Sequence, residues 1–164
     1  MSDSCGCPPE AGADGCDLRP APPGAPCPTN GQTGKRVDAL TLKALAAVPL
    51  TEVTRADYWF CPAPDCPTVY YSADGSQCFG EDQLRERVFQ KHRGEDKVWV
   101  CYCFRHTPGG IKGELAATHT TTVVAAIHAG IQAGQCACEI RNPQGSCCLG
   151  NVRALVRELS AHLG

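Results

Sequence analysis

The second half of the chain carries cysteines whose spacing suits metal binding better than disulfide bonding: Cys101, Cys103, Cys136, Cys138, Cys147 and Cys148. Two thiols one residue apart cannot close an ordinary disulfide without strain, because their Cα atoms sit at about 7 Å in an extended chain. A single zinc ion and an iron–sulfur cluster both require about four thiolates. Structural zinc sites usually draw on CxxC pairs, so the CxC pair and its distance from the downstream group favour a cluster.

A second set of thiols lies in the first half of the chain, at Cys27, Cys61 and Cys66. The stretch CPTNG has the shape of a zinc knuckle, with Asn30 where a second cysteine is expected. Cys61 and Cys66 flank a proline-rich turn between two aromatic segments, and such a hairpin is too small to bury an adequate core by itself. A metal cross-link to Cys27 would supply the missing stability. Three thiolates leave one position on a tetrahedral zinc, and the sequence leaves it open among Asn30, Asp65, a tail cysteine and water.

Several elements must position these thiols. Residues 58–60 and 68–71 are predicted as the two strands of a hairpin, because aromatic and β-branched residues flank a turn. Residues 37–45 are predicted as a short helix, or as a strand that leads into one. Residues 97–100 are predicted as a strand that delivers Cys101.

The downstream region is predicted to be helical. Thr107 is an N-cap residue followed by Pro108 in the first turn. Residues 120–133 place apolar side chains at helical spacing, and Gly134 can end that helix. Asn151 caps a last helix that carries an apolar stripe. Both sulfur groups of the second half thus fall at helix ends, where free backbone N–H groups and the positive end of a helix dipole stabilise thiolate charge.

Composition and charge limit the class of protein. The chain has 164 residues and a formal net charge of −2, which gives no reason to expect a nucleic-acid partner. It has neither an apolar run near the ~20 residues needed to span a bilayer nor a signal-peptide pattern, so we expect a soluble, cytoplasmic protein. The 13 cysteines are an odd number and cannot all pair, and in a reducing compartment such a count points to metal.

Two strings in the second half carry a resemblance to a known family. VCYCFRHT and CEIRNPQGSCCLGN resemble the N-terminal domain of CopZ-type copper chaperones, which holds a zinc ion and a [2Fe-2S] cluster. The second half is also similar to the [2Fe-2S] domain of bacterioferritin-associated ferredoxins. The CopZ resemblance covers roughly Cys27 to the C-terminus. It implies zinc at Cys27, Cys61 and Cys66, and cluster ligands at Cys101, Cys103, Cys138 and Cys148. The ferredoxin-like pattern would favour Cys136 in place of Cys138.

We therefore predict an α+β protein in three parts. Residues 1–26 form a disordered tail, because they are rich in Pro, Gly and Ala with little to bury. Residues 27–96 form a zinc-binding, β-rich module built around the hairpin. Residues 97–164 form a helical [2Fe-2S]-binding module.

The function that this resemblance implies is redox-assisted copper handling. The cluster would reduce Cu(II) to Cu(I), which thiolates favour, for transfer to a copper-transporting ATPase. In the tail, Cys5 and Cys7 form a further CxC pair suited to Cu(I). The chain departs from the fused chaperones because it has no CxxC motif and its one methionine is Met1. The alternatives are an electron or cluster carrier for a partner enzyme and a purely structural zinc protein.

Overall fold

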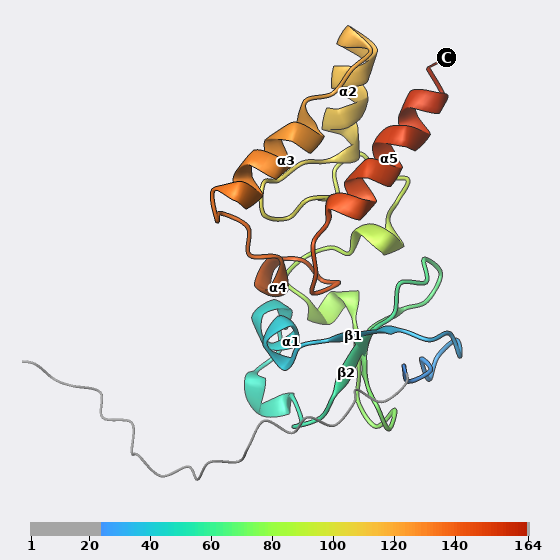
Figure 1. The fold of residues 1–164 in the computed structure, drawn as a ribbon. Helices are drawn as coiled ribbons and strands as arrows, with labels where there is room; N and C mark the ends of the chain where they lie inside the picture. The colour runs from blue at the N-terminus through green and yellow to red at the C-terminus, as the bar shows by residue number, and fades with distance from the viewer. Residues whose placement is uncertain (1–23, 164) are drawn as a thin grey trace, which may run out of the picture.

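The structure, a computed structural model, describes residues 24–163 and has an α+β architecture (Figure 1). Most of the predicted tail, with its three cysteines, lies outside the described residues. One antiparallel sheet runs in the order β1-β2-β3-β4, with strands at Lys35–Val37, Tyr58–Phe60, Thr68–Ser72 and Cys78–Gly80. The predicted hairpin is therefore confirmed as β2 and β3, but it is the centre of a four-stranded sheet.

The alternation of side chains along β2 and β3 gives the sheet two different faces. One face packs Tyr58, Phe60 and Tyr70 into an apolar core, which helix α1 (Ala39–Leu45) covers with Leu42 and Leu45. The other face carries aromatic side chains that pack with thiols, and this cluster contains Trp59, Tyr71, Cys27, Cys61, Ala63 and Cys66. The sheet thus separates a purely apolar core from a sulfur-bearing face.

The helix predicted near residues 37–45 is α1. The Asp38 carboxylate caps it by accepting the N–H of Leu40 at 2.7 Å. Single turns of 3-10 helix lie between α1 and α2, at Leu50–Glu52 (η1), Glu81–Gln83 (η2) and Phe89–Lys91 (η3).

Four α-helices follow, at Pro108–Thr118 (α2), Val123–Gln132 (α3), Cys138–Arg141 (α4) and Leu149–Ala161 (α5). The start of α2 is as predicted, because the Thr107 hydroxyl accepts the N–H of Gly110. Gly134 follows α3 with φ of +69°. The last helix begins earlier than predicted, with Cys148 rather than Asn151 at the N-cap position. No helix among residues 24–163 is long and apolar enough to cross a membrane.

Residues 97–100 do not form the predicted strand. Val98 and Val100 are instead buried in the core of the helical half, together with side chains from α2, α3 and α5. The N–H groups of Val100 and Cys101 both donate to the carbonyl of His106, so a tight loop takes the place of strand pairing. Residues 97–100 are therefore apolar and β-branched because they are buried between helices, and not because they form a strand.

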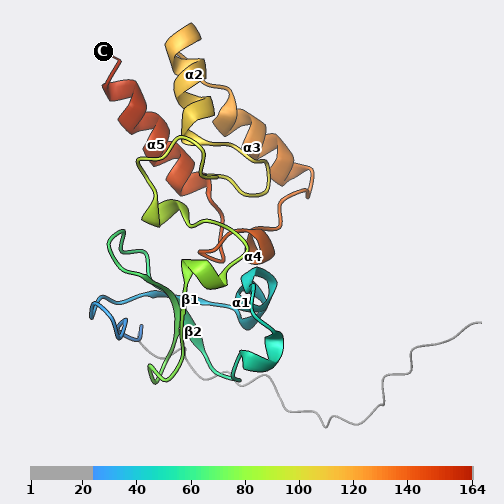
Figure 2. The same ribbon diagram turned by 180° about the vertical axis from the view of Figure 1, so that it is seen from behind.

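The sheet with α1 and the helical half of the structure meet at an interface of polar and apolar contacts, which we call the seam. Figures 1 and 2 show α4 beside α1, between the sheet end and the bundle of α2, α3 and α5. The Tyr70 hydroxyl, from the centre of the sheet, donates to the carbonyl of Pro143 at 2.5 Å. Lys35 donates to Ser146, and a Cβ built on Gly145 would lie 3.1 Å from the Thr41 hydroxyl oxygen. The loop before α5 therefore rests directly on the first half.

Candidate metal centres

The first candidate centre consists of Cys27, Cys61 and Cys66. Their sulfur atoms all lie within 4.8 Å of one another, and the three residues are buried. The Sγ atoms of Cys27 and Cys66 are 3.9 Å apart. The structure thus brings together the three thiols that the sequence suggested for zinc, at a spacing that fits one tetrahedral ion.

Local turns hold each thiol in place. Cys27 opens a turn in which its carbonyl accepts the N–H of Gly31, at φ of +73°, and its own N–H donates to Gln32. Cys61 follows β2 directly and donates its N–H to the carbonyl of Val69 on β3. The Cys66 N–H donates to the carbonyl of Ala63 and closes the proline-rich turn.

Hydrogen bonds tune the ionisation of these thiols. Burial opposes ionisation of Cys27, but the N–H groups of Asn30 and Thr29 and the two neighbouring thiols outweigh it and lower its pKa. Burial raises the pKa of Cys61, although the N–H of Ala63 and the charge of Lys91 partly offset this. The Cys27 thiol is therefore the one that its surroundings prepare best to bind metal as a thiolate.

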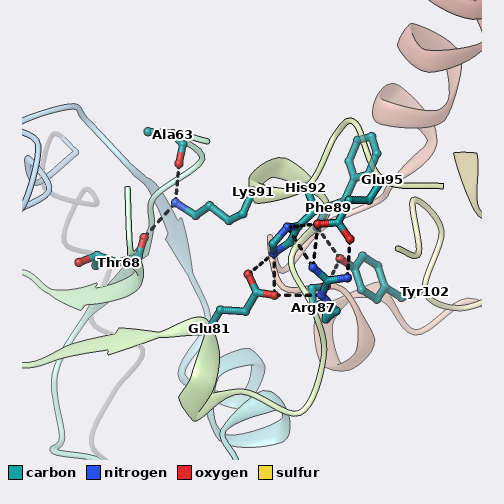
Figure 3. Close-up of polar contacts among 9 residues, drawn as sticks. All are labelled: Ala63, Thr68, Glu81, Arg87, Phe89, Lys91, His92, Glu95 and Tyr102. Atoms are coloured by element: carbon teal, nitrogen blue, oxygen red, sulfur yellow. Dashed lines mark hydrogen bonds and ion pairs between the residues drawn. The ribbon is translucent and has the colours of Figure 1, made fainter. Parts of the chain in front are cut away.

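Lys91, in η3, stabilises the turn that carries Cys66. The polar residues around Lys91 in the sequence did not indicate this role. Its ammonium group donates to the carbonyls of Ala63, at 2.6 Å, and Thr68, at 3.0 Å (Figure 3). These two carbonyls lie on either side of Cys66. Lys91 thus fixes the turn that carries Cys66 and places a positive charge near the thiols.

The second candidate centre consists of Cys101, Cys103, Cys138 and Cys148. Cys101, Cys138 and Cys148 are buried and Cys103 is half-buried. The Sγ atoms of Cys103 and Cys138 are 3.6 Å apart, and the Cys148 thiol interacts with both Cys101 and Cys138. Among residues 24–163, these four do not form a group compact enough for one ion, unlike the first centre. The donors of this centre are all thiols, and they are spread more widely than those of the first centre.

Backbone geometry in the second centre favours bound thiolates. Cys138 is the first residue of α4, and Cys148 is the N-cap residue of α5. The N–H of Ala137 donates to the Cys103 sulfur at 3.3 Å. The CxC pair itself does not lie at a helix end as predicted, because the loop 101–106 separates it from α2.

The thiols of this centre have unequal ionisation. The neighbouring Cys148 thiol lowers the pKa of Cys138 to about 6 and that of Cys101 to about 7, although burial opposes both shifts. Cys148 itself has a raised pKa. Burial raises the pKa of Cys103 to about 11.

The alternative cysteines lie apart from this network. Cys136 is half-buried and Cys147 is exposed, and within residues 24–163 neither thiol forms a hydrogen bond with another sulfur. Phe104, which follows the CxC pair, packs so closely on α3 that a Cβ built on Gly130 would lie 2.3 Å from its ring. The geometry thus gathers Cys138 rather than Cys136 beside the CxC pair.

Tyr102, between the two cysteines of the CxC pair, links this centre to the segment that contains Lys91. Its hydroxyl accepts the N–H of Phe89 at 2.9 Å and donates to the carbonyl of Arg87 at 2.7 Å (Figure 3). Arg87 forms ion pairs with Glu81 and Glu95, and the His92 ring lies within 2.8 Å of the same two carboxylates. The segment 87–91 is therefore bonded to both candidate centres, a role that its sequence did not indicate.

Comparison with known proteins points to one family. The family model of the CopZ-type zinc binding domain matches residues 24–85, which contain all three thiols of the first centre. A copper chaperone CopZ from Archaeoglobus fulgidus is 33% identical over 123 residues, which are 74% of this chain and 57% of that protein. The chain therefore spans a little over half the length of this relative. The X-ray structure of the A. fulgidus CopZ N-terminal domain matches 79% of this chain and 96% of its own, with 29% identity and a TM-score of 0.67.

Proposed function

Because the chain resembles the N-terminal domain of CopZ-type copper chaperones in sequence and in fold, we propose that it is a metal-binding protein of copper handling. In this proposal Cys27, Cys61 and Cys66 hold zinc. A [2Fe-2S] cluster is held by Cys101, Cys103, Cys138 and Cys148. The observation that carries the proposal is the presence of two separate thiol groups of different width, one sized for a single ion and one wider.

The zinc site has a structural role in this proposal. It ties the N-terminal turn at Cys27 to the β2–β3 hairpin, on a sheet face whose other members are Trp59, Ala63 and Tyr71. A bound metal contributes its binding free energy to folding, because the unfolded chain cannot offer the same site. The first half has a small apolar core, so this contribution is needed to keep the sheet face closed.

The residues of the second centre suit an electron-transfer site. A [2Fe-2S] cluster, when bound, exchanges one electron, which is the change that converts Cu(II) to Cu(I). The three buried cysteines exclude water, and the N–H of Ala137 stabilises negative charge on the Cys103 sulfur. Cys103 is half-buried, so this edge of the site lies nearest to solvent and to an approaching copper ion or partner.

Copper is the proposed substrate, and a copper-transporting ATPase is the proposed acceptor. This part of the proposal rests on the similarity to the A. fulgidus copper chaperone. The chain has no CxxC motif, so copper would have to be held by other thiols, of which the exposed Cys147 lies beside the cluster ligand Cys148.

The first experiment is metal analysis of the full chain purified without oxygen. We expect one zinc, two iron and two acid-labile sulfide per chain, together with visible absorption, because [2Fe-2S] clusters are coloured and zinc is not. The reduced protein, mixed with Cu(II) and a Cu(I)-specific chelator, should yield the Cu(I) complex. A protein with zinc but without labile sulfide would refute the cluster assignment, and a cluster protein that leaves Cu(II) unreduced would refute the reductase role.

A second candidate function is electron or cluster transfer to a partner enzyme. The lack of a CxxC motif favours it, because the chain then offers no such pair of thiols to hold copper for transfer. Stoichiometric Cu(I) binding by the full chain would decide against this candidate. A third candidate, a purely structural zinc protein, predicts a colourless sample.

A further inference from the structure

The loop between α4 and α5 contains a network of amide side chains, and Gln144 is its centre. The Gln144 amide nitrogen donates to the carbonyl of Cys147 at 2.9 Å and to that of Ser146 at 3.3 Å. Its amide oxygen accepts from the side-chain amides of Gln90 at 2.7 Å and of Asn151 at 2.9 Å. An amide group has two N–H donors and an oxygen with two lone pairs, so Gln144 uses its full hydrogen-bonding capacity.

Gln90 connects this loop to the CxC pair. It is buried in η3 and directly follows Phe89, whose N–H donates to the Tyr102 hydroxyl between the two cysteines of that pair (Figure 3). Among residues 24–163 the amide oxygen of Gln90 has no hydrogen-bond partner. Loss of the bond to Gln144 would therefore leave the whole buried amide unpaired, which is costly. The contact between these two amides thus joins the segment beside the CxC pair to the loop before α5.

The other contacts of Gln144 lie on both sides of Cys148. The Cys147 carbonyl belongs to the peptide unit that also contains the Cys148 N–H, and Asn151 lies in the first turn of α5, after Cys148. A trans peptide unit is planar, so its carbonyl and its N–H keep opposite directions. By holding the carbonyl of Cys147, Gln144 therefore fixes the direction in which the Cys148 N–H points.

The Cys148 N–H faces a neighbouring thiol of the second centre. The thiol and the backbone N–H of Cys148 both lower the pKa of Cys138, although burial opposes the shift, so this N–H lies close to the Cys138 sulfur. Hydrogen bonds to the sulfur ligands are among the factors that set the reduction potential of an iron–sulfur cluster. An N–H donor stabilises the extra negative charge of the reduced form and so raises the potential. The direction of this single peptide unit therefore bears on how readily a bound cluster accepts an electron.

We propose that Gln144 is a positioning residue of the second centre, which holds the Cys147–Cys148 peptide so that the Cys148 N–H donates to the Cys138 sulfur and raises the reduction potential of the cluster. The inference rests on the [2Fe-2S] cluster of the proposed function. Gln144 acts through the Cys147 carbonyl, and Gln90 and Asn151 hold Gln144 itself in place. Without this amide the peptide is free to turn, the bond to the Cys138 sulfur weakens, and the potential falls.

The test is the reduction potential of the full chain with its iron and zinc bound, measured by redox titration of the visible absorption. Gln144→Met keeps the length of the side chain and removes all four hydrogen bonds, so the potential should become more negative. Iron retention against a chelator should weaken about 10- to 100-fold, as is typical when a residue that orients a ligand is lost. Gln132→Met, at the exposed end of α3, is the matched control and should keep the wild-type potential.

A milder variant, Gln90→Met, decides the matter if Gln144→Met holds no iron. It removes one bond to the Gln144 oxygen and leaves both carbonyl contacts in place, so it should lower the potential by less than Gln144→Met. An unchanged or more positive potential in Gln144→Met would overturn the proposal, as would an equal shift in Gln132→Met. If Gln144→Met holds no iron, a wild-type potential in Gln90→Met would overturn it. Absence of iron from the wild type would instead refute the proposed function.

Discussion

The two candidate centres are assembled in different ways. The three-thiol site takes Cys61 and Cys66 from one hairpin and adds Cys27 through a short turn, so its parts belong to a single sheet face. The four-thiol site takes Cys101 and Cys103 from a loop, and Cys138 and Cys148 from the starts of two helices. The first centre therefore depends on local structure, whereas the second depends on how distant segments are held together.

Because of this difference, the second half depends on the first more than the first depends on the second. The loop that leads to Cys148 rests on the first half through Tyr70, Lys35 and the contact of Gly145 with Thr41. None of the first-centre thiols requires a helix of the second half, although η3 braces their turn through Lys91. We infer that a defect at the first centre should reach the second, whereas a defect at the second centre should reach the first only through the segment 87–91.

The largest expected effect comes from removing one ligand of each centre. Cys66→Ser should abolish zinc binding and also lower the iron content, because structural zinc contributes on the order of 10 kcal/mol to its domain. Cys148→Ser should abolish iron binding and leave zinc at one per chain. Iron and zinc analysis of both variants tests this, with Cys147→Ser as the control that keeps both metals. Full iron in Cys66→Ser would show that the two halves are independent.

A smaller effect is expected at the brace of the first centre. Lys91→Met removes both bonds to the turn that carries Cys66, and loss of such supporting contacts typically costs 10- to 100-fold in metal affinity. Competition with a zinc chelator measures this change. Lys91→Arg keeps the charge and donors and should lose less, so equal losses in the two variants would argue against a role for the hydrogen bonds.

Two neighbouring tyrosines, Tyr70 and Tyr71, allow each of the two centres to be perturbed by the removal of a single hydroxyl oxygen. Tyr70→Phe removes the bond to Pro143 and should cost about 1–3 kcal/mol, because it leaves a buried carbonyl unpaired, and it should speed loss of iron. Tyr71→Phe removes the bond to Ala25 beside the first centre and should affect zinc retention instead. Denaturant unfolding and metal-release rates measure both. If both variants released the same metal faster, the assignment of Tyr70 to the contact between the halves and of Tyr71 to the first centre would be wrong.

The smallest effect is expected at Asp74, in the turn between β3 and β4. Its carboxylate accepts from Ser72 and Ser76, which lowers its pKa to about 2 from an ordinary value near 3.9. Since the folded pKa is the lower one, this contribution is present above about pH 4 and is lost as the pH falls toward 2. The stability difference between wild type and Asp74→Asn should therefore shrink over that interval. A difference that stays constant down to pH 2 would show that ionisation of Asp74 does not matter.

Local chemistry explains which parts of the fold could be predicted from the sequence. The cap at Thr107, the β2–β3 hairpin and the nearness of Cys61 to Cys66 follow from short-range spacing. Cys27 lies far from them in the sequence, and it was expected beside them because the CPTNG string has the shape of a zinc knuckle. The addition of β1 and β4 to the sheet depends on long-range register, which short patterns do not contain. Residues 97–100 were wrongly predicted as a strand because burial between helices selects the same valines as a sheet does.

The contacts of the second centre show the same limit. The CxC pair was visible in the sequence, and the resemblance to CopZ-type domains favoured Cys138 over Cys136, but α4, which begins at Cys138, is too short to leave a periodic pattern. Lys91 and Tyr102 act through backbone carbonyls and N–H groups of remote residues, which no residue type specifies. Such roles become visible once the chain is folded.

Phe89, which bonds to Tyr102, and Lys91, which grips the turn at Cys66, are separated by a single residue. Because the connection is so short, the two contacts can move very little relative to each other. Metals bound at the two candidate centres would keep a nearly constant separation from one molecule to the next, and a paramagnetic reporter at one metal would sense the other at a single distance instead of a broad distribution.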